Sequence, residues 1–406
     1  MKPSTRALLA SSPYRRLFAS RLISNVGNGM QPIALAFGIL AIPGADPTSL
    51  SIVLAAQAIA VVLVLPLGGA VADRVGAARV VGLADLAISL LAFTAAVLFL
   101  THTVTVPALV VIGILMGALN GLWYPAFTAL TPDVVESEHL QPANAFVSIA
   151  SNVGYIAGAS IGGIIVATLG SGWAIAIDGV SFLVAGGLVF SIRRLSRSHS
   201  SGESMLGDIT HGWRVFISYR WVVVGVLAFS FIVMSWHGSE MVLGPVLADD
   251  IYGGARGWSV VLAGQSLGLL VGGIIASRVR AARPLLVGMV FMFALPLWQL
   301  FLAFELPLAM VAFGAFLAGL AVEFFYVVWI SAMQRHIPRE SLSRVGAYDA
   351  LGSLMFGPIG LALAGPLSLL IGLQQAFFLA AVISTLAIAA SLMSRALREV
   401  RMSPDA

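Results

Sequence analysis

Long apolar runs separated by short polar segments make up most of the chain. A helix needs roughly 20 apolar residues to cross a lipid bilayer, and each run is about that long or longer. Apolar and polar residues do not alternate within the runs with the period of two that a strand would show. The runs lie at residues 15–42, 48–72, 79–101, 105–130, 143–168, 172–193, 220–247, 257–277, 284–304, 306–333, 344–370 and 374–395. The pattern therefore predicts an all-α membrane protein with twelve transmembrane helices.

A polar segment at residues 196–214 divides these runs into two sets of six. We therefore expect an N-terminal six-helix bundle at residues 1–195, a cytoplasmic linker at 196–214 and a C-terminal six-helix bundle at 215–406.

The two halves also repeat each other in sequence. The segment GGAVADR at residues 68–74 matches GGIIASR at residues 272–278, an offset of 204. Gly158 is matched by Gly360 at an offset of 202. Matches at nearly one offset, each at the equivalent place in its half, predict an internal duplication. Two parallel six-helix repeats related by an axis normal to the membrane are a transporter architecture, so we expect the two bundles to be pseudo-symmetric.

Composition supports a membrane protein. The chain has 59% hydrophobic and 10% charged residues, whereas soluble domains carry roughly 25% charged residues. A soluble protein this apolar could not cover its surface with polar groups, so we expect its surroundings to be lipid.

The sequence lacks residues that several kinds of catalytic or cofactor site require. There is no cysteine, which excludes disulfides and cysteine-ligated metals. The one lysine is Lys2, so no lysine is available for a phosphate-binding loop that hydrolyses ATP. The pattern Gly-x-Ser-x-Gly occurs at residues 158–162 and 264–268, but inside apolar helices rather than at the strand-to-helix turn that exposes a nucleophile. We therefore expect a protein that is not an enzyme and has no cofactor and no metal.

Basic residues are distributed very unevenly over the loops. If the N-terminus is cytoplasmic, 21 of the 22 basic residues lie on the cytoplasmic side and Arg256 alone lies outside. Cytoplasmic loops of membrane proteins carry the excess of arginine and lysine, so both termini are predicted to be cytoplasmic. The net charge of +4 is then explained by loops that face anionic lipid, and no nucleic-acid partner is expected.

The loop after the second run carries a recognisable motif. It reads GAVADRVGAAR at residues 69–79 and resembles the signature loop between helices 2 and 3 of the major facilitator superfamily, except that alanines at 77 and 78 stand where that family has arginine or lysine. The resemblance implies a transporter of two six-helix bundles. It also implies a gating role for Gly69, Asp73, Arg74, Gly76 and Arg79.

In that role Asp73 would latch the cytoplasmic gate. It would pair with Arg79 and with the positive N-terminus of helix 11 near residues 341–344. The alternative is a carboxylate that only orders its own turn.

The fifth run carries a second motif. Its glycines resemble the antiporter motif of drug exporters in the same superfamily, although Ala145 and Ala159 stand where that motif has glycine and proline. The alternative is that small residues simply let two helices pack closely. The motif residues are Gly154, Gly158, Gly162 and Gly163.

Two further segments refine the resemblance. The stretch Tyr124-Pro125-Ala126 and the stretch from Gln334 to Pro338 are similar to the macrolide-efflux and enterobactin-exporter branch of the superfamily. Drug antiporters of the superfamily also have an arginine on helix 4, expected here near Gly117, and this chain has none there.

Ionisable residues inside the runs are candidates for proton coupling, because each costs roughly 2.5–3.5 kcal/mol at a helix centre and is retained for a reason. They are Asp85, Asp178, His237, Glu240, Glu323 and Asp349. Glu240 is the first candidate and Glu323 the second, with His237 and Asp178 as further candidates. His237 and Glu240 are three residues apart, so they are expected to share a helix face and could form a hydrogen bond there. For the three aspartates, which lie nearer helix ends, a purely structural role is the stronger alternative.

The resemblance also implies that helices 1, 4, 7 and 10 line a substrate cavity. The polar residues that these helices would supply are Arg21, Asn25, Asn28, Asn120, Tyr124 and Tyr326. The first three follow the i, i+4, i+7 spacing of one helix face.

Together these features predict a monomeric secondary transporter in the cytoplasmic (inner) membrane of a bacterium. We expect proton-coupled efflux, by alternating access, of a small amphipathic molecule such as a drug, an antibiotic or a siderophore-like metabolite. Its partners would be the substrate, the lipid bilayer and protons. A nutrient or metabolite importer on the same fold is the first alternative, and a membrane sensor or lipid-handling protein is a remote one.

The charge asymmetry makes the topology testable. Reporter fusions at Ala45, His102 and Gly170 should give the signal of the outer side, and fusions at Ser137 and Ser200 that of the cytoplasm. Reversed signals at any two of these sites would contradict the predicted orientation.

Overall fold

The computed structural model describes residues 11–135, 139–192, 213–279 and 282–400, and every regular element within them is a helix. Residues 196–212 of the predicted linker lie outside the described residues. The chain forms two compact units, Met1–Ser201 with Gly253–Ser259, and Gly202–Tyr252 with Val260–Ala406.

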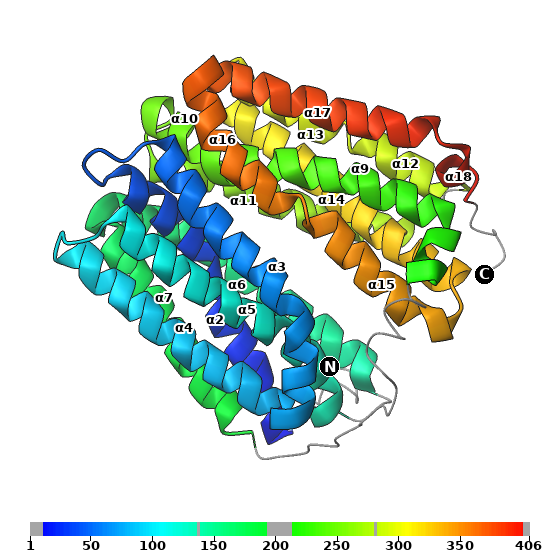
Figure 1. The fold of residues 1–406 in the computed structure, drawn as a ribbon, viewed down its shortest axis with the longest axis horizontal. Coiled ribbons are helices and arrows are strands. Elements are labelled where there is room, and N and C mark those ends of the chain that lie inside the picture. Colours follow the sequence, from blue (N-terminus) through cyan, green and yellow to red (C-terminus); the bar gives the residue numbers. More distant parts are fainter. Residues whose placement is uncertain (1–10, 136–138, 193–212, 280–281, 401–406) are drawn as a thin grey trace. The chain divides into compact units, whose positions relative to one another are not determined.

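The first unit is a bundle of six helices, coloured blue to green in Figure 1. In this unit α3 packs along α5, α4 packs along α7, and α2 packs along both α6 and α7. The helices are α2 (Ser12–Leu40), α3 (Pro47–Val75), α4 (Ala77–Leu100), α5 (Val106–Val134), α6 (Leu140–Leu169) and α7 (Ser171–Phe190).

The second half repeats these pairings. There α9 packs along α16 and α17, and α13 packs along α14 and α17. The helices of this half are α9 (Arg220–His237), η2 (Gly238–Leu243), α10 (Gly244–Ile251), α11 (Ala255–Arg278), α12 (Pro284–Phe291), α13 (Ala294–Ala303), α14 (Leu308–His336), α15 (Arg339–Leu354), α16 (Gly357–Ile371), α17 (Leu373–Met393) and α18 (Arg395–Arg398). Counted in chain order, α2 to α7 are spans 1 to 6, and the second half supplies spans 7 to 12 as α9, α11, α12 with α13, α14, α15 with α16, and α17. The contacts of span 1 with 5, 3 with 6 and 1 with 6 are therefore repeated as 7 with 11, 9 with 12 and 7 with 12, which confirms the predicted pseudo-symmetry.

Single glycines make the shortest connections, and they too repeat. Gly76 separates α3 from α4, Gly170 separates α6 from α7, and Gly372 separates α16 from α17. Their φ angles of 97°, 91° and 95° lie in the left-handed region that favours glycine. Gly170 and Gly372 are 202 residues apart, the offset found in the sequence.

Three of the predicted runs are not single α-helices. The run at 284–304 is broken after Phe291, the run at 344–370 after Leu354, and the run at 220–247 contains the π-helical turn η2. A proline four residues beyond a carbonyl cannot donate to it and clashes with it. Pro296 and Pro358 act in this way on the carbonyls of Met292 and Leu354, where the first two breaks occur.

Eleven helices of the described chain are long and apolar enough to cross a membrane. The helix outside this set is α2, which has 29 residues but carries the polar side chains of Asn25, Asn28 and Gln31 along its middle. With α2 as the first of the predicted spans, the helices reproduce the expected order of apolar runs.

Glycines bring paired helices into backbone contact. A Cβ atom added to Gly158 of α6 would lie 2.0 Å from the carbonyl oxygen of Val26 on α2, and one added to Gly360 of α16 would lie 1.9 Å from that of Met234 on α9. Gly117 and Gly319 repeat this relation, at 2.2 Å in both cases, with the carbonyls of Gln57 and Gln265. The second relation also shows that α11 packs on α14 as α3 packs on α5.

These contacts predict that even one methyl group is disruptive. Gly158→Ala should lower the free energy of unfolding by about 1–3 kcal/mol, because overpacking forces the backbones of α2 and α6 apart. Gly187→Ala on α7 is the matched control, since no atom lies within 4 Å of its added Cβ. Thermal unfolding of the detergent-purified variants measures the difference, and equal midpoints for the two would contradict the prediction.

Candidate functional site

Arg21 of α2 is held against two aromatic rings of α5. Its guanidinium carbon lies 4.6 Å from the ring centroid of Trp123 and 4.6 Å from that of Phe127. The two rings stack on each other, with centroids 4.7 Å apart and planes 6° apart. A cation beside aromatic faces is a cation–π contact. The resemblance leads one to expect an arginine on the fourth span, which is α5, and none is present there. The guanidinium that lies against α5 comes from Arg21 of α2 instead.

Two of the predicted cavity residues direct their amides onto their own helices. Nδ2 of Asn25 donates to the carbonyl oxygen of Arg21 at 2.7 Å, and Nδ2 of Asn120 donates to that of Met116 at 3.0 Å. Asn28 is partly buried, and Tyr124 is 63% exposed. A role of these side chains in substrate binding stays a prediction.

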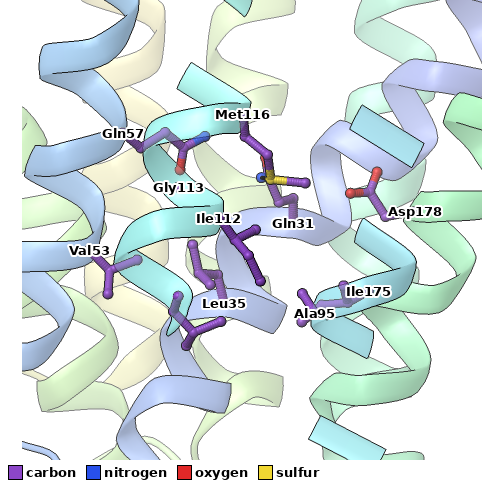
Figure 2. Close-up of a pocket in the computed structure, with 11 residues that line it drawn as sticks. Gln31, Leu35, Val53, Gln57, Ala95, Ile112, Gly113, Met116, Ile175 and Asp178 are labelled. Atoms are coloured by element: carbon purple, nitrogen blue, oxygen red, sulfur yellow. Dashed lines mark hydrogen bonds between the residues drawn. The ribbon is translucent and has the colours of Figure 1, made fainter. Parts of the chain in front are cut away.

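A small, largely apolar pocket lies inside the first unit. Its volume is about 30 Å³, and its lining comes from α2, α3, α4, α5 and α7. Most of the lining is apolar, but Gln31, Gln57 and Asp178 contribute polar groups (Figure 2). A cavity of this volume can hold a water molecule and is far too small for a drug-sized ligand, whose pocket measures roughly 300–1,000 Å³.

Asp178 of α7 is the ionisable residue of this pocket. It is 1% exposed, and the Ser181 hydroxyl lies beside its carboxylate. Gly27 of α2 makes room for both groups, since an added Cβ there would lie 2.1 Å from Oδ1 of Asp178 and 2.2 Å from Oγ of Ser181. A carboxylate buried this deeply with so few donors is costly in its ionised form, which keeps Asp178 among the candidates for proton binding.

The corresponding place in the second unit is filled by neutral groups. Between α9 and α17, which pair as α2 and α7 do, Ser235 and Ser384 have hydroxyl oxygens 2.6 Å apart. Ser384 also donates to Oε1 of Gln299 at 3.0 Å. Among the described residues, this helix pair of the second unit is therefore joined by neutral groups, whereas Asp178 lies between α2 and α7 of the first.

Glu240 lies in the π-helical turn η2. Its Oε2 accepts hydrogen bonds from Nε1 of Trp236 and, at 2.6 Å, from Nε2 of Gln265 on α11. Pro245 cannot donate to the carbonyl of Met241, which accounts for the widened turn before it. Such π turns are frequent at functional sites.

The structure corrects the predicted hydrogen bond between His237 and Glu240. The carboxylate is bonded to Trp236 and Gln265 instead, and the His237 ring lies next to Gly357, where an added Cβ would be 2.9 Å from Nδ1. The physical reason is the π-helical turn. Its wider hydrogen-bonding pattern moves residues three apart off a common face and aligns Glu240 with Trp236, four residues earlier.

Glu323 of α14 is partly buried and faces α11. A Cβ added to Gly273 would lie 3.5 Å from its Cγ and 3.8 Å from its Oε1. Tyr326, one turn further along α14, is 55% exposed. The roles predicted for Glu323 and Tyr326 stay predictions.

The gating motif forms the end of α3 and the start of α4. Asp73, Arg74 and Arg79 are all exposed, and no hydrogen bond joins Asp73 to Arg79 in the part of the chain that the structure describes. Gly76 supplies the turn between the helices with its φ of 97°. The latch function of Asp73 stays a prediction.

The glycine motif of the fifth span, which is α6, packs against α2. Added Cβ atoms at Gly154 and Gly158 would lie 2.5 Å and 2.0 Å from the carbonyl oxygens of Leu22 and Val26. Gly162 lies against Met30 in the same way, and Gly163 is buried. These contacts show close helix packing, and an antiport role of the motif stays a prediction.

Several polar and aromatic partners of the site were not among the residues expected from the sequence. They are Gln31, Gln57, Trp123, Phe127, Trp236 and Gln265. The spacing of four between Trp123 and Phe127, and again between Trp236 and Glu240, is a usable signal. Gln57 and Gln265 are equivalent in the structure, because Gly117 and Gly319 lie on their carbonyl oxygens, but their separation of 208 residues differs from the repeat offset of 202–204, so the sequence repeat did not pair them.

Comparison with known proteins identifies the family. The model of the family described as "Major Facilitator Superfamily" matches residues 17–275. The chain is 29% identical over 385 residues to the multidrug efflux pump Tap of Mycolicibacterium fortuitum, covering 89% of this chain and 90% of Tap. It is 24% identical over 369 residues to the enterobactin exporter EntS of Escherichia coli O1:K1 / APEC, covering 87% of each.

Solved structures agree on the fold. The nucleoside transporter NupG superposes with a TM-score of 0.74 at 13% identity, covering 94% of this chain and 98% of NupG. A bacterial homologue of the human lysosomal transporter Spinster, in an inward-facing conformation, gives a TM-score of 0.70 at 14% identity and full coverage of both chains, 100% of each.

The hydrogen bonds of Glu240 allow a test that needs no substrate. Gln265→Leu should lower the free energy of unfolding by about 1 kcal/mol, since it removes a hydrogen bond between membrane helices. Gln57→Leu, at the equivalent position of the first unit, is the control, because the described residues give its side chain no hydrogen-bond partner and its pocket is largely apolar. Chemical or thermal unfolding in detergent measures both, and an equal loss for Gln57→Leu would show that the bond to Glu240 contributes nothing special.

Proposed function

This chain belongs to the Major Facilitator Superfamily, and on that premise we propose that it is a proton-coupled exporter of a small amphipathic molecule. It is a multi-pass membrane transporter and not an enzyme. In the proposal it works as a monomer in the inner membrane of a bacterium, with both termini in the cytoplasm. It alternates between conformations open to either side, and its substrate is a drug, an antibiotic or a siderophore-like metabolite.

Two curated relatives support the direction of transport. Both Tap and EntS are named for efflux or export, and each aligns with this chain over nearly nine tenths of both lengths. The structural neighbours share only 13–14% identity, so they support the fold and not the direction or the substrate.

The observation that carries the coupling proposal is the environment of Glu240. It lies within a transmembrane helix, in a π-helical turn, and two side-chain N–H groups donate to it. A carboxylate inside a membrane bundle is costly to retain, and proton relays of transporters are built from such groups. The hydrogen bonds from Trp236 and Gln265 fix the position of the Glu240 carboxylate. A group that binds and releases a proton at one point of the transport path needs such a fixed position.

In the proposed cycle, protonation from the outside releases the substrate, and deprotonation on the inside lets a new substrate bind. Glu323 is the second candidate for the proton, and His237 and Asp178 are further candidates. Arg21, Asn25, Asn28, Asn120, Tyr124 and Tyr326 are proposed to contact the substrate.

A growth screen can identify the substrate. Expression in a host that lacks its own exporters, followed by growth on a panel of antibiotics, dyes and siderophores, should reveal at least one compound that the protein removes. Accumulation of that compound in the cells, rather than its removal, would favour the importer.

The coupling proposal predicts a separation of two activities. Glu240→Gln, which mimics the protonated carboxyl, should abolish uphill transport driven by an imposed pH gradient in everted vesicles. It should leave exchange of labelled for unlabelled substrate intact, because exchange needs no net proton movement. If Glu240→Gln and Glu323→Gln both keep full uphill transport, these carboxylates are structural and the proton is carried elsewhere.

A further inference from the structure

Unpaired buried polar atoms gather at one place in the first unit. Among the described residues, Nε of Arg21, Oδ1 of Asp85 and Nε1 of Trp123 are buried and lack a hydrogen bond of normal geometry, although the Trp123 side chain lies close enough to Asp85 to interact with its carboxylate. These residues come from α2, α4 and α5. Native proteins keep few such atoms, and each calls for an explanation.

The Arg21 side chain is partly buried, with a buried Nε, and it is poorly hydrogen-bonded. It offers five N–H donors, and within the described part of the chain its side-chain hydrogen bond runs from Nη1 to Oγ of Ser24 at 3.3 Å. Its flat face lies against the rings of Trp123 and Phe127. The rings hold the cation in place without satisfying its donors.

Asp85 is the anion that faces this cation. It is 1% exposed, and its Cβ is packed against α7, where a Cβ added to Gly186 would lie 3.0 Å away. Trp123 links the two groups, because the Arg21 guanidinium lies on its ring and its side chain interacts with the Asp85 carboxylate. The opposite charges of Arg21 and Asp85 attract each other across this contact, and among the described residues no direct hydrogen bond joins them. The neighbouring Ser89 cannot serve Asp85, because its hydroxyl donates to the carbonyl of Gly179 at 2.7 Å.

Other charged groups near this cluster are engaged elsewhere or exposed. Arg16 of α2 donates to the carbonyl oxygen of Ser191 at 2.7 Å. Arg79 at the start of α4 and Arg74 at the end of α3 are exposed.

Two further carboxylates on the elements around Asp85 are set apart from it. On α7, Asp178 lies eight residues from Gly186, which is about 12 Å along a helix, and it packs at Gly27. On α5, Asp133 is six residues beyond Phe127 and is partly buried near the helix end. Arg21 is therefore the counter-charge of Asp85.

We propose that Asp85 binds and releases a proton during transport, with Arg21 as its counter-charge. This inference rests on the proton coupling proposed above and adds a second titrating site, in the opposite repeat from Glu240. The proton joins a carboxylate oxygen of Asp85 and later leaves from the same atom, so no other group is consumed.

The consequence of protonation follows from the contacts. While Asp85 is ionised, charge attraction draws α2 toward α4 through Arg21. When Asp85 is protonated, that attraction is lost and only the rings of α5 hold the guanidinium. The proton thereby changes what holds α2, the helix that also carries the candidate substrate residues Asn25 and Asn28.

The test separates a coupling pair from a structural ion pair. The protein is reconstituted in liposomes with a compound from the growth screen, and a trapped pH dye measures proton movement during substrate transport. Asp85→Asn should reduce substrate-driven proton movement at least tenfold, while exchange of labelled for unlabelled substrate stays within twofold. Asp349→Asn is the matched control, since Asp349 accepts a hydrogen bond from Nε1 of Trp329 at 3.1 Å and an asparagine can still accept it.

The neutral double variant Arg21→Gln/Asp85→Asn makes the test independent of the folding of Asp85→Asn. It contains no unpaired buried charge and should fold, which its thermal unfolding midpoint checks. Because Arg21 is also a proposed substrate contact, proton movement is measured per substrate molecule exchanged by the same variant, and this ratio should stay at the uncoupled level of Asp85→Asn. Recovery of proton-coupled transport in this variant would show that the pair is only structural and would overturn the proposal.

Arg21→Gln alone gives a readout that a structural role would not produce. Without the cation, the ionised carboxylate is less favourable and the proton is held up to higher pH. The pH profile of gradient-driven transport should therefore move to more alkaline values, and an unmoved profile would contradict the role of Arg21.

The outcomes also distinguish the two proposals. If Glu240→Gln is uncoupled and Asp85→Asn is fully coupled, only the inference about Asp85 fails. If the unmodified protein moves substrate without moving protons, the proposed coupling fails and the inference fails with it.

Discussion

The fold depends on helix backbones that touch each other. Lipid offers no hydrophobic drive for helices to associate, so they depend on close packing and on small residues that permit it. Gly158 and Gly117 in the first unit, and Gly360 and Gly319 in the second, each place a helix directly on the carbonyl of its partner. These contacts position the polar side chains of neighbouring helices, because a bundle packed this closely leaves each side chain few places to lie.

Polar groups inside such a bundle either form hydrogen bonds with one another or can bind a proton or a substrate. In the second unit, Ser235, Ser384 and Gln299 form a neutral set of hydrogen bonds, and Glu240 has two donors. In the first unit, the buried carboxylates Asp178 and Asp85 have fewer donors, Ser181 for the one and Trp123 for the other. The duplication thus produced two similar scaffolds whose buried polar groups have diverged. This divergence suits a transporter, since a repeat whose buried charges are incompletely paired has a reason to change conformation when a proton arrives.

The position of the Arg21 guanidinium shows that the same region of a fold can receive a charged group from a different helix. An arginine on helix 4 was expected from the resemblance and is absent. A guanidinium nevertheless lies against that helix, supplied by Arg21 of α2 and held by Trp123 and Phe127. Because helices 1 and 4 both belong to the first bundle, either can bring a charge to the same region. A motif read along one helix therefore gives an incomplete account of a site assembled from several.

The sequence by itself determined the spans, their order, the repeat and the family, because hydrophobic length, loop charge and glycine spacing are local properties that lipid constrains strongly. It also indicated which side chains in the spans are ionisable. It did not determine the partners of those side chains. The expected bond between His237 and Glu240 assumed a regular α-helix, and the π-helical turn before Pro245 turned the carboxylate to Trp236 and Gln265 instead. Asp85 was expected to be structural from its place near a helix end, but packing brought Arg21 and Trp123 to it from two other helices. Such pairings depend on which faces of distant helices meet, and only the tertiary structure decides that.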